Sequence, residues 1–321
     1  MTKPAFVILL VGAGELGSRH LQSLACLAGS QIDVIEPSEA ACQIAKTRLA
    51  QVEVLAKVSF YSSDNTLKLN YDLAIIATSA AIRFEVTKQL LHKTKLDYLI
   101  LEKVLFQRPE HYHELKHLLE EHQVSAYVNC PRRLFPLYQH LKTLARGGPV
   151  SMHVTGNNWG LACNSIHFID LVSYLTDKKL EAVDSTQLQS CFASKRPGFL
   201  EVSGQLTAHF QSGSTLQLQC SADELNPALV TIDLVSAAGH WQIDESKGRV
   251  KCRQSGVILL DGLPTLFQSQ LTASVVQTLQ QQGACSLTPY NESADLHLPL
   301  IQSLLLYFNK MHGPMDLCPV T

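Results

Sequence analysis

Short runs of apolar residues alternate with amphipathic segments along the first 130 residues of the chain. The apolar runs, which predict strands, cover residues 6–11, 32–35, 52–58, 71–77, 97–101 and 125–128. The segments between them, which predict helices, cover residues 18–27, 38–49, 81–93 and 109–121. Regular alternation of strand and helix is typical of a doubly wound parallel sheet. The pattern therefore predicts a Rossmann-type α/β domain over residues 1–130.

The pattern changes after a predicted helix at residues 135–145, because alternation with a period of two residues then predominates. The predicted strands cover residues 150–155, 181–188, 200–210, 215–221, 229–236 and 241–244. Helical spacing returns at residues 266–282 and 291–312. Alternating strands are typical of an antiparallel sheet with one covered face. We therefore expect residues 131–321 to form an α+β domain with a large, mainly antiparallel sheet.

The first predicted strand ends in a glycine-rich turn with the pattern G-x-G-x-x-G. This turn contains Gly12, Gly14, Glu15, Leu16 and Gly17. Gly12 permits a tight turn, Gly14 lets the backbone approach a ligand because no Cβ intervenes, and Gly17 lets the next helix pack closely on the strand. The helix would present unpaired N–H groups and the positive end of its dipole to a diphosphate. The pattern predicts a dinucleotide site to which these five residues contribute.

A carboxylate follows the second predicted strand. Glu36 comes nineteen positions after Gly17, where dinucleotide-binding folds place the acid that binds the adenosine ribose. The same carboxylate would repel the 2′-phosphate of NADP, so we expect NAD as the cofactor. The alternative interpretation is a solvated glutamate that opens the turn Glu-Pro-Ser.

Ligands of a doubly wound sheet bind at the carboxyl ends of its strands. Besides Gly12 and Glu36, several polar residues follow predicted strands and would lie along the same edge. They are Thr78, Ser79, Glu102, Lys103, Asn129 and Arg132. The alternative for Lys103 is a surface lysine, and for Arg132 it is a solvated residue at a domain joint.

A second polar cluster interrupts the strands of the second domain at residues 157–171. Histidine suits proton transfer near neutral pH, which makes His167 a candidate catalytic residue. Cys163 and Asn164 precede it by four and three residues and Asp170 follows it by three, so a helix would group them. Cys163 and His167 are too few ligands for zinc, and we expect no metal. The alternative is a structural histidine.

The composition favours a small, roughly neutral ligand. With 321 residues the chain is long enough for two domains. Its formal net charge of −2, with both signs interspersed, gives no basic surface for nucleic acid or an anionic membrane. The apolar run at residues 6–11 is too short for a signal peptide or a membrane span. Nine cysteines without a C-x-x-C pair suit reduced thiols, and we expect a cytoplasmic protein.

Three motifs resemble those of the Gfo/Idh/MocA family of NAD(P)-dependent oxidoreductases. Residues 102–104, Glu-Lys-Val, resemble the family's Glu-Lys-Pro motif, and residues 130–133 resemble its Asn-x-Arg-Arg stretch. Residues 160–170 resemble the glycine-led segment in which an aspartate and, four residues later, a histidine face the substrate.

The chain departs from the family pattern at three positions. Val104 replaces the proline, and we expect a trans peptide bond there. Cys163 replaces the aspartate, and Arg83 stands where a histidine often follows the fourth strand. Cys163 cannot offer a carboxylate to sugar hydroxyls, so we expect neighbouring asparagines to supply hydrogen bonds instead.

The resemblance implies hydride transfer between a nicotinamide and a hydroxyl or carbonyl carbon of a sugar, a cyclitol or a nucleotide-sugar derivative. It implies that His167 moves the hydroxyl proton and that Lys103 stabilises the developing alkoxide. The expected substrate contacts are Asn157, Trp159, Cys163, Asn164, Asp170 and Arg132. Beside the glycine turn and Glu36, the expected cofactor contacts are Thr78, Ser79, Arg83, Glu102 and Lys103.

The family also implies a homodimer or homotetramer that associates through the carboxy-terminal sheet. Two other functions stay open. A binding or regulatory protein that kept the nucleotide fold but lost the chemistry would explain Cys163. A methyltransferase would share the glycine turn and Glu36, but it would explain neither Lys103 nor His167.

Overall fold

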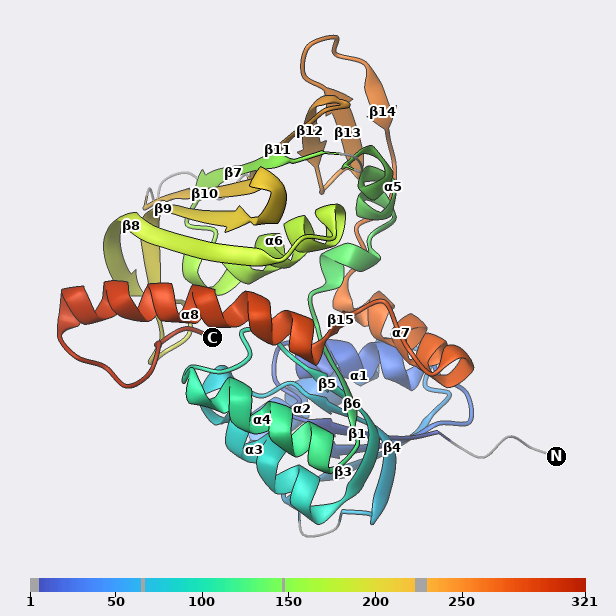
Figure 1. The fold of residues 1–321 in the computed structure, drawn as a ribbon. Helices are drawn as coiled ribbons and strands as arrows, with labels where there is room; N and C mark the ends of the chain where they lie inside the picture. Colours follow the sequence, from blue (N-terminus) through green and yellow to red (C-terminus); the bar gives the residue numbers. More distant parts are fainter. Residues whose placement is uncertain (1–5, 65–66, 146–147, 223–229) are drawn as a thin grey trace. The chain divides into compact units, whose positions relative to one another are not determined.

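The computed structural model describes residues 6–64, 67–145, 148–222 and 230–321 (Figure 1). Two compact units divide the chain. The first contains Met1–Phe106, Glu110–Asn129 and Leu266–Asn291, and the second contains Gln107–Pro109, Cys130–Thr265 and Glu292–Thr321. A division into domains after residue 130 stays a prediction, and the contact pattern adds residues 266–291 to the first unit.

A seven-stranded sheet forms the centre of the first unit. Its strands are β1 (Val7–Val11), β2 (Gln31–Ile35), β3 (Lys57–Tyr61), β4 (Asn70–Ile76), β5 (Lys95–Leu101), β6 (Ser125–Val128) and β15 (Thr288–Pro289). The strand order is β15-β6-β5-β4-β1-β2-β3, and all pairs are parallel except β15 with β6. The order reverses between β1 and β4, which is where doubly wound sheets bind ligands.

Five helices accompany this sheet among the described residues. They are α1 (Gly17–Ala25), α2 (Glu39–Leu49), α3 (Ala80–Lys93), α4 (Glu110–Glu121) and α7 (Gln268–Gln282). Because crossovers between parallel strands are right-handed, the reversal of strand order sends α1 and α2 to one face and α3 and α4 to the other. Helix α1 packs against α2 and α7, and α3 packs against α4. The predicted Rossmann-type sheet is confirmed.

The third strand lies later than the sequence predicts. Residues 52–58 were the predicted strand, but β3 spans Lys57–Tyr61. The preceding residues form a loop that caps the end of α1, since Leu55 N and Ala56 N both donate to the carbonyl oxygen of Ala25. Val54 and Leu55 are nearly half exposed, so the apolar run does not reach the core.

An eight-stranded sheet forms the second unit. Its strands are β7 (Ser151–Asn157), β8 (Leu180–Ala193), β9 (Leu200–Phe210), β10 (Thr215–Ser221), β11 (Thr231–Ser236), β12 (Gly239–Asp244), β13 (Arg249–Cys252) and β14 (Ile258–Leu260). The strand order is β14-β13-β12-β11-β7-β10-β9-β8. Only the β7–β10 pair is parallel, which confirms a mainly antiparallel sheet. The sequence pattern missed β13 and β14, and Leu229, the first residue of one predicted strand, lies outside the described residues.

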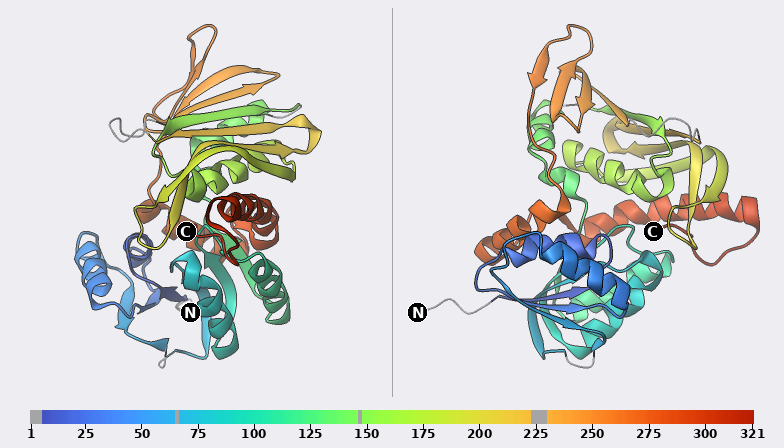
Figure 2. Two further views of the ribbon diagram at one scale, coloured as in Figure 1. Left: turned by 90° about the vertical axis from the view of Figure 1, so that its left-hand side faces the viewer. Right: turned by 180° about the vertical axis from the view of Figure 1, so that it is seen from behind.

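Helices cover one face of this sheet. They are the 3₁₀ turn η2 (Pro131–Leu134), α5 (Pro136–Ala145), α6 (Leu161–Thr176) and most of α8 (Tyr290–His312). Helix α6 packs on β9 and β10 through buried residues such as Ile166 and Ile169, and α8 lies beside it under the same face (Figure 2). Three of the α6 residues that the sequence marks as functional, Cys163, Asn164 and His167, are half-buried and lie outside this core.

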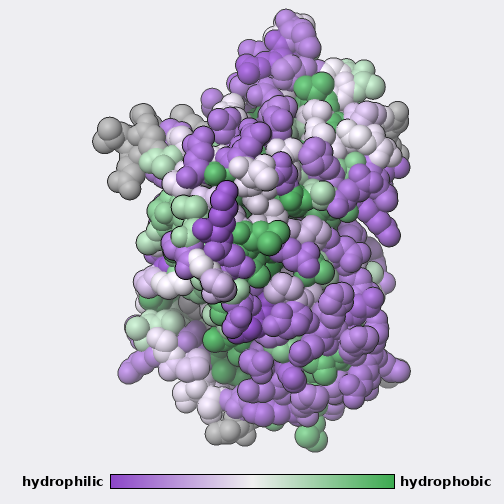
Figure 3. Space-filling view, turned by 60° about the vertical axis from the view of Figure 1, so that its left-hand side comes forward, coloured by the Kyte–Doolittle hydropathy of each residue, from purple (hydrophilic) through white to green (hydrophobic). Residues whose placement is uncertain are grey.

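Hydrophobic and hydrophilic residues are interspersed on the molecular face in Figure 3. Among the described residues, no helix combines the length and the apolar composition that a membrane span requires.

Candidate nucleotide and substrate sites

The glycine turn connects β1 to α1 with little room for side chains. Gly12 has φ +87°, and its N–H donates to the carbonyl oxygen of Ile35 at 2.9 Å. A Cβ at Gly17 would lie 1.9 Å from the carbonyl oxygen of Gly12, so only glycine fits there. In contrast, a Cβ at Gly14 would meet no heavy atom within 4 Å. The turn is therefore tight at both ends and open at its middle glycine.

The carboxylate of Glu36 joins this turn to the end of β2. Its Oε2 accepts a hydrogen bond from Ala13 N at 2.7 Å, and its Oε1 accepts one from Ser38 N at 2.9 Å. Ser38 in turn begins α2, since its hydroxyl accepts from Ala41 N. Two backbone N–H groups thus hold the carboxylate of Glu36 between the glycine turn and the start of α2.

A pocket of about 540 Å³ opens beside Glu36 at the carboxyl ends of β1, β2, β3 and β4. Five residues predicted to bind the cofactor line it: Gly12, Gly14, Glu36, Thr78 and Ser79. The hydroxyl of Thr78 is buried and has no hydrogen-bond partner among the described residues. The volume lies within the range of about 300–1,000 Å³ that small-molecule sites occupy.

The sequence reasoning missed two parts of the pocket wall. Ser62, Ser63 and Asp64 follow β3 and line the pocket. They were overlooked because the third strand was placed several residues too early, although the alternation of Val58 and Phe60 before a polar turn marks the real strand end. Ile82, Val86 and Leu90 also line the pocket, and their spacing of four residues puts them on one face of α3.

Arg83 does not line the pocket. Its guanidinium is buried and donates to the carbonyl oxygens of Thr78, Val104 and Leu105. Arg83 therefore ties the segment after β4 to the segment after β5, and we do not include it among the proposed cofactor contacts.

Glu102 lies in a buried polar network at the carboxyl end of β5. Its Oε1 accepts from Asn129 Nδ2 at 2.5 Å and lies 2.8 Å from Nε2 of His20 on α1. The other ring nitrogen of His20 lies 2.9 Å from the hydroxyl of Thr272 on α7. Burial raises the pKa of Glu102, but the His20 and Asn129 hydrogen bonds and the charges of His20 and Arg83 outweigh it, so the pKa lies below its ordinary value. Glu102 thus joins α1, β6 and α7 instead of lining the pocket.

Lys103 follows Glu102 directly, at the edge where the strands of the parallel sheet end. The peptide bond between Lys103 and Val104 is cis, so the expectation of a trans bond at this position was wrong. Cis peptide bonds are otherwise found almost exclusively before proline.

Helix α6 brings three of the predicted residues of the second unit together. Cys163, Asn164 and His167 are half-buried, whereas the residues between them are buried. Gly160, with φ +78°, precedes the helix, and a Cβ there would lie 2.9 Å from Sγ of Cys163. The buried carboxylate of Glu201 on β9 accepts from Ala162 N at 2.8 Å and from Cys163 N at 3.2 Å. Glu201, which the sequence did not mark, therefore caps the helix that carries His167.

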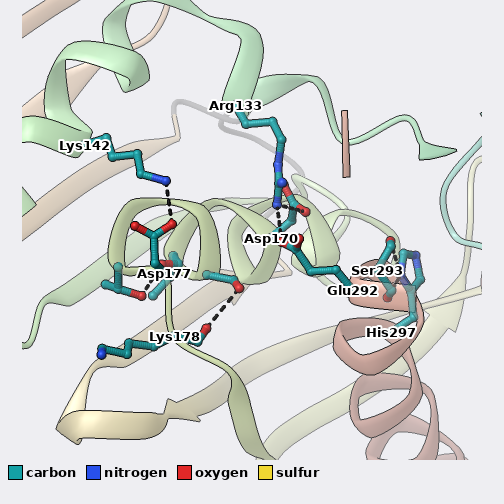
Figure 4. A network of polar contacts seen from close by, with 11 residues as sticks. Arg133, Lys142, Asp170, Asp177, Lys178, Glu292, Ser293 and His297 are labelled. Carbon is teal, nitrogen blue, oxygen red and sulfur yellow. Dashed lines mark hydrogen bonds and ion pairs between the residues drawn. The ribbon is translucent and has the colours of Figure 1, made fainter. Parts of the chain in front are cut away.

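Asp170 has a different environment from the other residues of this cluster (Figure 4). It is buried, and its two carboxylate oxygens accept from Arg133 Nε at 3.0 Å and Nη2 at 2.7 Å. Arg133 also donates to Glu292 at the start of α8, at 3.0 Å. Asp170 therefore anchors α6 to η2 and α8, and because Arg133 holds both of its oxygens we do not include it among the proposed substrate contacts.

Arg132 and Trp159 are also committed to contacts within the second unit. Arg132 forms a two-pronged ion pair with Glu245 at 2.7 and 3.0 Å, and its guanidinium lies 4.3 Å from the ring centre of Phe168. The indole N–H of Trp159 donates to the carbonyl oxygen of Gln219 at 2.9 Å, and its ring is 8% exposed. Asn157 stays half-buried at the end of β7.

Comparison with known proteins identifies the first unit. Residues 6–130 match the model of the Gfo/Idh/MocA family, described as an oxidoreductase family with an NAD-binding Rossmann fold. Residues 6–130 belong to the Gfo/Idh/MocA oxidoreductase family. This match confirms the family resemblance and the enzyme class that the motifs implied. A search among curated proteins finds no match to the chain.

Several solved structures share the fold of nearly the whole chain. UDP-N-acetylglucosamine 3-dehydrogenase from Acidithiobacillus ferrooxidans is 15% identical, with a TM-score of 0.71 over 93% of this chain and 96% of that chain. Scyllo-inositol dehydrogenase from Lactobacillus casei, with bound NAD(H) and scyllo-inositol, is 16% identical, with a TM-score of 0.66 over 96% and 98%. An oxidoreductase from Agrobacterium radiobacter in complex with NAD+, L-tartaric acid and magnesium is 15% identical, with a TM-score of 0.70 over 96% and 97%. At these identities the likeness establishes the fold.

The residues of the Gfo/Idh/MocA pocket fit the dinucleotide that the family description names. The open space at Gly14 leaves room for a diphosphate beside the first turn of α1, where helix N–H groups lack partners. The carboxylate of Glu36 and the hydroxyl of Thr78 supply polar partners for a ribose, and the apolar face of α3 suits an adenine ring. Gly12, Gly14, Glu36 and Thr78 would therefore hold the cofactor.

Proposed function

We propose that the chain is an NAD-dependent dehydrogenase or reductase that acts on a sugar, a cyclitol or a nucleotide-sugar derivative. The observation that carries the proposal is the pocket beside the glycine turn, with the carboxylate of Glu36 held at its edge. The family of residues 6–130 supports the reaction class. The names of the similar structures, which include an inositol and a nucleotide-sugar dehydrogenase, support the substrate class.

NAD is the proposed cofactor, in preference to NADP. The 2′-phosphate of NADP would lie against the carboxylate of Glu36, with no compensating cation among the residues that line the pocket. Titration of the protein with each dinucleotide, followed by fluorescence, tests this choice. NAD should bind at least about tenfold more tightly, a difference of about 1.4 kcal/mol. The Glu36→Gln variant should reduce the difference between the affinities for NAD and NADP. Equal affinities for the two dinucleotides in the wild-type protein would contradict the choice of NAD.

Lys103 and His167 are the proposed catalytic residues. Bound NAD would exchange the hydride with the substrate carbon. His167 would accept the hydroxyl proton during oxidation, and Lys103 would orient the hydroxyl and stabilise negative charge on its oxygen. The position of Lys103 at the ligand-binding edge of the sheet supports its role. The half-buried position of His167, near Cys163 and Asn164 on α6, supports its role as the proton acceptor.

Asn157, Cys163 and Asn164 are the proposed substrate contacts. All three are half-buried around the start of α6. Asn157 Oδ1 accepts from the Ser221 hydroxyl at 2.5 Å and Asn164 Nδ2 donates to the carbonyl oxygen of Trp159 at 2.7 Å. An amide side chain has both donors and acceptors, so each asparagine can add a hydroxyl contact to the bond that it already makes. Asp170, Arg132 and Trp159 are left out, because ion pairs or packing within the second unit occupy them.

A screen of polyols, aldoses and nucleotide sugars with NAD, followed at the absorbance of NADH, tests the proposed activity. Turnover should appear with at least one of these compounds, and it should disappear in the His167→Ala variant. His140→Ala is a matched control, because His140 is exposed on α5 and, in the part of the chain that the structure describes, its ring bonds to the carbonyl oxygen of Pro136 in the same helix. Absence of turnover with the whole set would contradict the proposed activity.

A binding or regulatory protein is the second candidate, and Cys163 favours it. The thiol stands where the family carries a carboxylate, and its Sγ lies 3.6 Å from the carbonyl oxygen of Gly160. NAD binding without turnover over the whole screen would favour this function. Robust turnover of any one compound would exclude it.

We further propose a cytoplasmic homodimer or homotetramer that associates through the open face of the eight-stranded sheet. On β9, half-buried Gln205 and Thr207 alternate with buried Leu206 and Ala208, so the open face is polar and uncharged there. A partner can cover such a face without burying unpaired charges. Light scattering should report a dimer or tetramer, and Thr207→Glu should shift it toward the monomer. A monomeric wild-type protein would contradict the proposed assembly.

A further inference from the structure

Arg48 on α2, which belongs to no recognised sequence motif, forms hydrogen bonds to the glycine turn and to the first turn of α1. Arg48 lies in the last turn of α2 and donates three hydrogen bonds. Its Nη1 donates to the carbonyl oxygen of Glu15 at 2.8 Å and to Oγ of Ser18 at 2.7 Å, and its Nη2 donates to the carboxylate of Glu15 at 2.5 Å. We propose that Arg48 is a positioning residue for the diphosphate of the cofactor, an inference that rests on the proposed nucleotide function.

The orientation of the peptide groups in the turn gives Arg48 this role. In a planar trans peptide the carbonyl and the following N–H point in opposite directions. The hydroxyl of Ser18 donates to the carbonyl oxygen of Gly14 at 2.7 Å, while Arg48 holds the carbonyl oxygen of Glu15. These two contacts fix the directions of the N–H groups of Glu15 and Leu16. Those groups lie at the start of α1, where helix N–H groups bind anions.

Arg48 also compensates an unfavourable charge. The carboxylate of Glu15 lies within the turn and is 75% exposed, so it would repel a diphosphate bound there. The Arg48 hydrogen bond and charge lower the pKa of Glu15, so the carboxylate is ionised at neutral pH and is paired with the guanidinium. The side chain of Arg48 is only 16% exposed, which shields its contacts from water.

Arg19 provides an internal comparison. It neighbours Ser18 on α1, is exposed, and donates to Gln22 of its own helix at 2.8 Å. Arg19 thus brings a positive charge near the turn, and its charge also lowers the pKa of Glu15, though less than Arg48 does. Among the described contacts it does not hold a carbonyl of the turn. Arg19→Ala is therefore a matched control for Arg48→Ala.

The test compares a ligand with a diphosphate and a ligand without phosphate. The dissociation constants of ADP-ribose and adenosine are measured by calorimetry for the wild-type protein and for Arg48→Ala, Arg48→Lys and Arg19→Ala. Arg48→Ala should raise the dissociation constant of ADP-ribose about tenfold and leave that of adenosine within about twofold of the wild-type value. Arg48→Lys should recover only part of the lost affinity for ADP-ribose. An ammonium lacks the planar guanidinium that contacts the carbonyl and the carboxylate of Glu15 at the same time. Arg19→Ala should change the dissociation constant of either ligand by less than about twofold.

The double variant Arg48→Ala with Glu15→Gln separates orientation from charge. Removal of the carboxylate should restore only part of the affinity for ADP-ribose, because the carbonyl of Glu15 stays unanchored. Full recovery would overturn the positioning role, as would equal weakening of both ligands or no change in either. A wild-type protein that binds neither ADP-ribose nor NAD would overturn the proposed nucleotide function together with this inference. ADP-ribose binding that is insensitive to Arg48 would overturn this inference alone.

Discussion

The glycine turn of the first unit and helix α6 of the second unit both carry residues that the sequence marks as functional, yet these residues have different surroundings. In the first unit, Gly12, Gly14 and Glu36 line one pocket. In the second unit, His167 is half-buried on α6, whereas Asp170, three residues further, is enclosed in an ion pair with Arg133.

The difference shows which kinds of role a short motif determines. The function of the turn depends on backbone geometry, which the glycines impose locally through φ and the absence of a Cβ. The function of a polar side chain on α6 depends on the distant residue that meets it. The Asp170 carboxylate accepts from the guanidinium of Arg133 on η2, whereas at Cys163 it is the backbone N–H that donates to the carboxylate of Glu201 on β9.

The largest effect is expected from the two proposed catalytic residues, one in each unit. Lys103→Ala and His167→Ala should each lower the turnover number by about 10²- to 10⁴-fold, the usual range for loss of an acid–base or charge-stabilising group. The dissociation constant of NAD should stay within about twofold, because neither residue lies in the glycine turn. Turnover with the best substrate and NAD titration measure the two effects. Unchanged turnover in both variants would refute the assigned chemistry.

Disruption of the ion pair in the second unit should produce the next largest effect. Among the described residues, Asp170→Ala leaves the buried guanidinium of Arg133 with Glu292 as its one carboxylate partner, and the change should lower the free energy of unfolding by about 3–5 kcal/mol. Denaturant titration measures the change, with His167→Ala on the same helix as the comparison. If Asp170→Ala and His167→Ala unfold with equal free energies, Asp170 does not anchor α6 in the way inferred here.

The glycine turn should show a smaller effect that depends on position. Gly17→Ala forces a Cβ against the carbonyl of Gly12 and should lower the free energy of unfolding by about 1–3 kcal/mol. Gly14→Ala meets open space, so it should preserve stability and weaken ADP-ribose binding instead. Thermal unfolding and calorimetry distinguish the two substitutions. Equal destabilisation by both would contradict the geometry of the turn.

The smallest effect concerns the buried network behind the pocket. The folded-state pKa of Glu102 lies below its ordinary value of 4.5, so its ionised form stabilises the fold above that value. This stabilisation is lost as the pH falls from about 4.5 through the folded-state pKa. Unfolding free energies at a series of pH values should therefore fall less steeply in acid for Glu102→Gln than for the wild-type protein. Parallel curves would show that Glu102 does not contribute in this way.

Much of the fold was predictable from residue patterns alone. Fully buried parallel strands are continuous apolar runs, so β1 and β4 could be recognised from their composition. The glycine turn and Glu36 could be placed because their spacing follows from one β-α-β unit. The strand β3 was misplaced because an apolar run at 52–58 is partly exposed, and exposure depends on contacts with α1 that a local pattern does not contain.

Residue spacing and hydrophobic periodicity were enough to predict the Rossmann-type sheet, the family of residues 6–130 and the tight glycine turn, because short-range backbone geometry and short motifs encode them. In contrast, three contacts could be found only from the folded chain: Arg48 with this turn, Glu201 with the start of α6, and Asp170 with Arg133. Each of these contacts joins residues more than thirty positions apart. The partner of a polar side chain is set by the packing of whole elements, which brings such residues within hydrogen-bond distance.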